Sequence, residues 1–431
     1  MRSKILNFYA VAILLGVFTG TIGSIFMLAI EKMMALLTQG FNYTSSRGWP
    51  LGLVSAIVSM VMVYTAWLMV KWIALEASGS GVHEIEGTLL HKRPIRWRRL
   101  LPVKFVGGVL AISSKLVVGR EGPIIQMGGN LGEMLGEWFK LSRNHRDSLI
   151  AAGAAAGLAT AFNAPLAGIL FVLEEMRKQF RFTFTNISAV TISCVVAVIM
   201  LHMMIGADPI IAMPIFRLLN PGLLWIFFIF GITVGLAGLI FNLVLMKSLS
   251  CIHKLSPIIR DVYVLVVGFL MGYLAFLQPE LVGGGFNIIE KALSMNPPYF
   301  ILFMFVVVRF ITTMLSYNVG VPGGFFAPML ALGTLLGLGM SDILQWLDLS
   351  VEPGMLALAG MGALFAAVVR APITGIVLVV EMTQNYSLIL PLLVTCLTST
   401  TVVQLARNRP IYTQLLNHTL KKQGQSADRS S

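Results

Sequence analysis

Two glutamates placed among apolar residues are the first candidates for chemistry. Glu121 lies in the string GREGP at 119–123, and Glu175 stands directly before the basic loop 177–181. A carboxyl group inside a bilayer is costly, so it marks a functional site by default, and a carboxyl group can carry a proton. From the residues alone two simpler interpretations stay open. Glu121 could form an ion pair with Arg120, and Glu175 could be an interfacial charge at a helix end.

Glycine-rich strings interrupt the apolar segments at three places and suit the binding of an anion. They are GSG at 79–81, GREGP at 119–123 and GGFFAP at 323–328, and a helix-compatible run follows each of them. Glycine lets backbone N–H groups approach a ligand, and proline is favoured in the first turn of a helix, so each string predicts a helix N-terminus. Such an end binds anions through its free N–H groups and its dipole. For any single string, a glycine that only packs helices closely is the alternative.

Metal and enzyme chemistry find little support in the residues. The three cysteines, Cys194, Cys251 and Cys396, lie far apart, without the spacing of metal ligands or of a disulfide framework. The pair His83-Glu84 lacks the second histidine of a zinc-protease HExxH motif. We therefore expect no enzyme, no metal and no cofactor.

The composition is typical of a membrane protein. Hydrophobic residue types make up 57% of the 431 residues and charged types 12%, whereas soluble domains carry about 25% charged residues. Short or interrupted runs predict helices that stop mid-bilayer around a polar site. Because Glu31-Lys32 follows the first run in place of a small-residue cleavage site, we expect a retained first helix rather than a signal peptide. The apolar runs are 5–30, 51–70, 101–118, 149–173, 187–201, 222–246, 261–277, 299–316, 355–380 and 387–405.

The chain repeats itself at a nearly constant offset. Residues 153–176 match residues 360–382 when Pro165 is set on Pro372, an offset of 207, which also pairs Glu174 with Glu381. The string at 119–123 falls on 324–328 and the string at 79–81 on 283–285, in the same order. Three ordered matches indicate a duplication. We expect one integrated transmembrane domain with a first repeat at 1–206, a second at 207–405, and a last helix segment with a short tail at 406–431.

The basic loops predict that the two repeats have opposite orientations. Three windows of the first half, 91–99, 140–146 and 177–181, carry eleven Lys or Arg, and the matched windows 295–303, 345–351 and 384–388 carry none. The positive-inside rule gives this contrast when equivalent loops lie on opposite faces, and it also accounts for the net charge of +12 without nucleic acid. The expected fold is therefore an all-α polytopic membrane protein with two inverted-topology repeats of tilted and broken helices. Parallel repeats are the alternative. Both termini are basic and are expected in the cytoplasm.

Several strings resemble those of the CLC family of chloride channels and chloride/proton exchangers. GSGVHE at 79–84, GREGP at 119–123, GGFFAP at 323–328 and the tyrosine of RPIY, Tyr412, occur in the family's order. The resemblance covers nearly the whole chain, and LPVKF at 101–105 and the segment 151–176 are most similar to the bacterial exchangers.

The resemblance implies a role for each matching residue. Ser80 and Tyr412 would coordinate a central chloride through their hydroxyl groups, together with the backbone N–H groups of Phe325 and Phe326. Glu121 would be the gating glutamate, and Glu175 would transfer protons from the cytoplasm. The implied function is exchange of chloride for protons across the bacterial inner membrane by a homodimer, with a passive chloride channel of the same fold as the alternative.

Two residues depart from the family pattern. His83 stands where the family usually has proline, and either tunes the response to pH or is a tolerated substitution. Lys115 stands in an apolar run six residues before Glu121. Its ammonium group either pairs with Glu121 or extends along apolar surface to water.

Overall fold

The computed structural model describes residues 2–177, 180, 182–216, 220–291, 299–349 and 351–428. Within these residues the chain forms seventeen α-helices and four short 3-10 turns, and no β-strand. The helices are α1 (Arg2–Ser46), α2 (Leu51–Trp72), α3 (Val82–Leu89), α4 (Trp97–Ser113), α5 (Glu121–Trp138), α6 (Arg143–Phe162), α7 (Pro165–Glu175), α8 (Phe184–Met204), α9 (Leu224–Lys254), α10 (Pro257–Leu277), α11 (Phe286–Lys291), α12 (Tyr299–Asn318), α13 (Phe326–Trp346), α14 (Pro353–Val369), α15 (Pro372–Thr383), α16 (Ile389–Leu405) and α17 (Ile411–Asp428). The all-helical prediction is confirmed.

Among the residues that the structure describes, eight helices are long and apolar enough to cross a membrane, by their length and composition. They are α1, α2, α8, α9, α10, α12, α13 and α16. The apolar runs 149–173 and 355–380 are each divided into two shorter helices, α6 with α7 and α14 with α15. Both breaks have the same cause, because a residue in the left-handed conformation ends the first helix and a proline begins the second. Asn163 has φ +49° before Pro165, and Arg370 has φ +71° before Pro372.

The two halves also share their helix ends and helix contacts. Lys140 after α5 and Asp348 after α13 both have positive φ, and each helix closes with the same 6→1 hydrogen bond, from Leu141 N to Gly136 O and from Leu349 N to Leu344 O. Where α5 packs on α6, a Cβ at Gly153 would lie 2.0 Å from Gly128 O. In the second half, a Cβ at Gly360 would lie 2.2 Å from Gly333 O. Both contacts exclude any side chain, so α13 and α14 meet backbone to backbone as α5 and α6 do.

Each half caps a helix of the other half. The Glu174 carboxylate at the end of α7 accepts hydrogen bonds from the N–H groups of Ile373 and Thr374 at the start of α15. The Glu381 carboxylate at the end of α15 accepts from the N–H groups of Leu166 and Ala167 at the start of α7. Because a helix leaves its first N–H groups without intrahelical acceptors, these two glutamates satisfy groups that would otherwise be unpaired.

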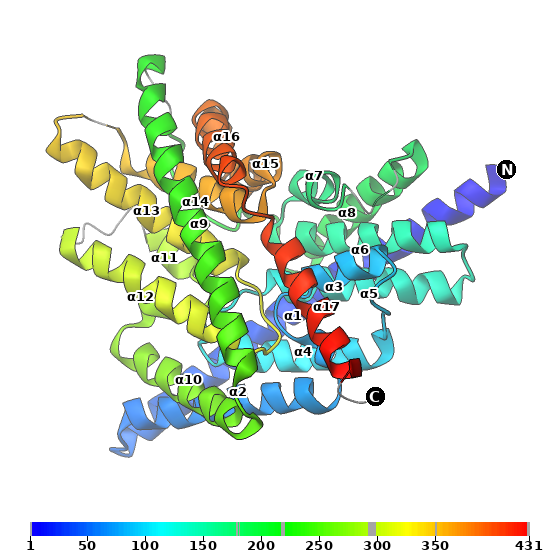
Figure 1. Ribbon diagram of the computed structural model, residues 1–431, viewed down its shortest axis with the longest axis horizontal. Coiled ribbons are helices and arrows are strands. Elements are labelled where there is room, and N and C mark those ends of the chain that lie inside the picture. Colours follow the sequence, from blue (N-terminus) through cyan, green and yellow to red (C-terminus); the bar gives the residue numbers. More distant parts are fainter. Residues whose placement is uncertain are drawn as a thin grey trace.

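Figure 1 shows α5–α8 on one side of the molecule and α9 with α11–α16 on the other, with α17 running between them. α17 contacts α3 of the first half and both α9 and α14 of the second. The domain boundaries at 206 and 405 and the orientation of the repeats remain predictions. Parts of the loop 177–181, the window 295–303 and the tail after residue 428 lie outside the described residues.

Candidate functional site

The three glycine strings converge at the middle of the fold, held by backbone hydrogen bonds. Gly79 N donates to Val321 O, and Gly323 N donates to Gly79 O. Gly119 and Gly324 exchange both of their N–H···O bonds, at 2.7 and 2.9 Å. All three strings precede helices, since α3 follows 79–81, α5 begins at Glu121 and α13 begins at Phe326. The prediction of three helix N-termini is confirmed.

Two buried hydroxyl groups face this junction. Ser80 and Tyr412 are both fully buried, and apart from each other neither Ser80 Oγ nor the Tyr412 phenol oxygen has a hydrogen-bond partner in the described chain. Tyr412 is held by aromatic contacts, with ring-centroid distances of 5.6 Å to Phe325 and 5.8 Å to Phe326. Buried polar groups are rarely left without a partner, so two such hydroxyls at one place indicate a site for a ligand.

Backbone N–H groups complete the junction. Phe325 and Phe326 stand at the N-terminus of α13, and neither N–H group has a backbone acceptor among the residues that the structure describes. Space there is limited, because a Cβ at Gly122 would lie 2.6 Å from Ser80 Oγ. Free N–H groups at the positive end of a helix dipole favour an anion.

Glu121 is the first residue of α5 and is fully buried. Its carboxyl group lies beside the backbone N–H groups of Arg120, of Glu121 itself and of Ala327 in the first turn of α13. The alternative of an ion pair with Arg120 finds no support, because within the described residues no such pair forms and the Arg120 guanidinium lies 5.2 Å from the centre of the Phe286 ring. The carboxylate therefore sits where helix N-termini favour negative charge.

Lys104 is a buried cation beneath the junction that sequence reasoning missed. Its side chain is fully buried in α4, and Nζ donates to Ala77 O at 3.0 Å and to Gly79 O at 2.7 Å. The amino group thus fixes the loop that carries Ser80. LPVKF at 101–105 contains this lysine, but its acceptors lie more than twenty residues earlier in the chain.

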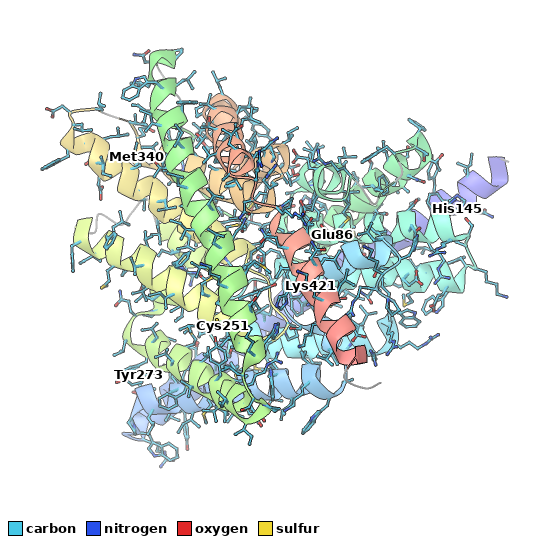
Figure 2. The ribbon with its side chains drawn as sticks, in the orientation of Figure 1. Glu86, His145, Cys251, Tyr273, Met340 and Lys421 are labelled. Atoms are coloured by element: carbon cyan, nitrogen blue, oxygen red, sulfur yellow. The ribbon has the colours of Figure 1, made fainter. Side chains whose placement is uncertain are left out.

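Glu175 is half-buried at the end of α7, and its side chain lies next to that of Glu86 on α3. Both lie close enough to Tyr412 to interact with its phenol electrostatically, and Figure 2 labels Glu86 close to α17, which carries that tyrosine. Glu86 was missed as a partner because it is on another helix, 89 positions before Glu175.

The two departures from the family pattern lie on either side of the junction. Lys115 does not lie within a helix, although its apolar neighbours suggested that it would. It follows the C-terminus of α4 with φ +71°, forms no ion pair with Glu121 in the described structure, and lines a cavity of about 490 Å³ with Glu31, Glu280 and Arg120. His83 is buried in α3, with Nε2 3.8 Å from Glu84.

Known proteins resemble this chain over most of its length. The family profile described as voltage gated chloride channel matches residues 62–404. The chain belongs to the CLC family. The H(+)/Cl(-) exchange transporter ClcA of Vibrio parahaemolyticus is 45% identical to this CLC chain over 421 residues, covering 95% of the chain and 89% of that protein. The ClcA of Salmonella arizonae is 41% identical over 418 residues, covering 96% and 88%.

Solved structures of the family share the architecture. The crystal structure of a slow cyanobacterial Cl-/H+ antiporter superposes on this CLC chain with a TM-score of 0.93 at 40% identity, covering 97% of this chain and 99% of that one. A eukaryotic CLC transporter, at 21% identity and a TM-score of 0.82, covers 98% of this chain and 75% of its own and shares the fold. The resemblance carried by the glycine strings is therefore confirmed for the whole chain.

Proposed function

We propose that this CLC protein exchanges chloride for protons across the membrane. The observation that carries the proposal is one junction that combines unpartnered hydroxyls, free helix N-termini and a buried carboxyl group. Ser80, Tyr412 and the N–H groups of Phe325 and Phe326 bind chloride. No full positive charge touches the ion directly, so the ion is held weakly enough to leave.

Glu121 is the gate. Its ionised carboxylate is itself an anion and occupies the position that chloride would take beside the N-termini of α5 and α13. Protonation removes that charge, and the side chain leaves the path to chloride. One proton is thus exchanged against the anion at the same place, which couples the two movements.

Glu175 supplies the protons. In this proposal Glu175 and the neighbouring Glu86 hold a proton next to the junction, and the basic residue Arg177 follows on the face expected to be cytoplasmic. Both Glu121 and Glu175 are carboxylates here, which favours an exchanger over a passive channel. The names of the ClcA relatives support the same choice.

The protein acts in this proposal as a homodimer in the bacterial inner membrane, with both termini in the cytoplasm, and needs no cofactor. The exchange transporter relatives come from bacteria. Exposed apolar residues on α7, α8 and α16, among them Leu166, Met203 and Leu405, give a second copy or lipid a surface to cover.

Flux through liposomes tests the proposal. An outward chloride gradient is imposed on vesicles that hold the purified protein, and proton uptake against no initial pH difference is recorded with chloride efflux. Wild type is expected to move both ions, and Glu121→Gln to move chloride alone, because the amide mimics the protonated carboxyl. Chloride flux without any proton movement in wild type would identify a channel. Proton pumping by Glu121→Gln would remove Glu121 as the gate.

A further inference from the structure

A cluster of cationic side chains lies in a cavity next to the chloride junction. The cavity is lined by the last turns of α9 and by α17. The cavity has a volume of about 510 Å³ and includes Ser78 and Gly79, the two residues before Ser80, in its lining. This volume is within the range of small-molecule sites, roughly 300–1,000 Å³. We call this cavity the vestibule. In Figure 2, Cys251 on α9 and Lys421 on α17 mark the two helices that flank it.

The charges that line the vestibule are unequal. Its one carboxylate, Glu84, is occupied by Arg93 in a two-point ion pair with distances of 2.6 and 2.9 Å. Arg260 in the first turn of α10 and Lys422 on α17 add two further cations. Asp261, the neighbour of Arg260, pairs instead with Lys71 at 3.2 Å and does not line the vestibule. The net charge of the lining is therefore positive.

Arg260 is the strongest sign that a ligand is missing. Its Nε is buried without a hydrogen-bond partner, and within the described residues its guanidinium makes no ion pair. Burial lowers the pKa of Lys422, and the positive charge of Arg260 lowers it further. Two cations that disfavour each other across one cavity are relieved by an anion bound between them.

Two imidazole rings extend the same surface. His253 at the end of α9 lies against His418 of α17, with ring centroids 4.8 Å apart and Nδ1 to Nε2 at 3.4 Å. Two histidines so placed could be ligands of a metal ion, but Arg260 and Lys422 oppose a bound cation. Burial and the charges of Lys422 and Lys421 lower the pKa of His418, which again reflects a positive site. Neutral imidazole N–H groups then serve as hydrogen-bond donors to an anion.

We propose that the vestibule binds a polyphosphate group, as carried by inorganic pyrophosphate or a nucleoside triphosphate, and that the bound group blocks the anion path at Ser80. A guanidinium fork and an ammonium on different helices match several phosphate oxygens, whereas chloride offers one small sphere. Ser80 and Tyr412 are fully buried, so a large hydrated polyanion binds below them without passing. The blocking role rests on the proposed transport function, while the binding does not.

Calorimetry on the full-length protein in detergent, at low ionic strength and neutral pH, tests the binding with pyrophosphate. We expect saturable binding that Arg260→Gln and Lys422→Gln each weaken at least fivefold. Lys421→Gln is the matched control, since it removes the same charge from the neighbouring position outside the vestibule lining, and it should weaken binding clearly less than Lys422→Gln does. If Arg260→Gln does not fold, Lys422→Gln against Lys421→Gln still decides.

Further measurements show which part of the ligand is recognised and which results would overturn the proposal. Adenosine triphosphate that binds as tightly as pyrophosphate assigns recognition to the phosphate chain, and tighter binding adds a contact to the base. Absence of saturable pyrophosphate binding, equally tight sulfate binding, or an equal loss in Lys421→Gln would overturn the site. In liposomes, pyrophosphate should slow wild-type chloride flux at least fivefold, and Lys422→Gln should need at least fivefold more pyrophosphate for the same slowing. Binding without any slowing would overturn the block. If the protein did not couple protons to chloride, the calorimetric test of pyrophosphate binding would be unaffected, so the two failures can be distinguished.

Discussion

Glu174 and Glu175 are neighbours in sequence, but their carboxyl groups make different contacts. Glu174 accepts two backbone N–H groups and the Thr374 hydroxyl, at 2.7 to 3.0 Å, so its oxygens are committed to a helix end. Glu175 instead lies next to Glu86 and close to Tyr412. In the proposed mechanism the first glutamate is therefore structural, and the second is available for proton transfer.

Replacing Glu175 by glutamine should stop proton movement and leave passive chloride movement, because the residue lies off the chloride junction. Parallel recordings of chloride and proton flux in liposomes measure both effects. Glu174→Gln is the control, since this side chain caps α15 and has no part in the proposed proton path, and it should remain coupled even though its amide keeps only one of the two acceptor atoms. A complete loss of chloride flux in well-folded Glu175→Gln would mean that Glu175 is structural.

Lys115→Met should leave the dependence of chloride flux on external pH where it is. The lysine follows α4 in a left-handed turn and lines an open cavity, so its ammonium reaches water and does not act on Glu121 directly. The two proteins are compared by flux across a series of external pH values. A displaced activation curve in Lys115→Met would show that the two side chains are coupled after all.

The positions of residues that lie within short glycine-rich strings could be predicted from the sequence. The positions of residues whose partners come from other helices could not. Ser80, Glu121 and Phe325 lie within strings whose glycines mark helix ends, so their position at the junction followed from the sequence. Lys104 and Glu86 depend on partners from other elements, and no local period or spacing signals those contacts. The left-handed backbone conformation of Lys115 was also not predicted, because its apolar neighbours suggested a continuing helix.

At the scale of the elements, glycine decides how closely helices approach. α13 meets α14 through Gly333, where a Cβ would lie 2.3 Å from Gly360 O. In the sequence, 149–173 and 355–380 are single apolar runs, so the breaks before Pro165 and Pro372 were not predicted, and neither was the end of α1. The apolar run stops at 30 whereas α1 continues to Ser46, since the first strong stop signals are Gly48, with φ +72°, and Pro50.

Gly333→Ala should lower the thermal stability of the purified protein markedly or prevent its folding. The added methyl group meets backbone atoms that cannot move without separating α13 from α14. Gly339→Ala on the same helix is the matched control, because its Cβ would lie 3.8 Å from the Leu302 side chain. It should be neutral or stabilising by about 0.5–1 kcal/mol. Equal melting temperatures for both variants would contradict the close contact.

At the scale of the whole molecule, the two halves repeat each other down to single turns. Gly79 and Gly81 have φ of +63° and +83°, and their matched residues Gly283 and Gly285 have +70° and +99°. The duplication was predictable because its marks are glycines and prolines, which local backbone geometry requires. The relative orientation of the halves rests on loop charge, which acts through the membrane and not through contacts within the chain.

Cysteines introduced at Lys140 and Asp348 should react from opposite sides of the membrane. These exposed residues occupy the same left-handed turn after α5 and α13. In a background with exposed Cys251 replaced by serine, a membrane-impermeant maleimide should label Lys140→Cys only from the cytoplasm and Asp348→Cys only from outside. Labelling of both from one side would establish parallel repeats.

The exchange of caps between Glu174 and Glu381 sets an order of events during synthesis. The acceptor for Leu166 N lies 215 positions further along the chain, so α7 leaves the ribosome long before its N-terminus is satisfied. Unpaired N–H groups are costly in lipid. A nascent chain that stops before residue 381 therefore keeps them exposed however stable its own helices are. The four backbone hydrogen bonds that Glu174 and Glu381 accept therefore form only after both halves have been synthesised.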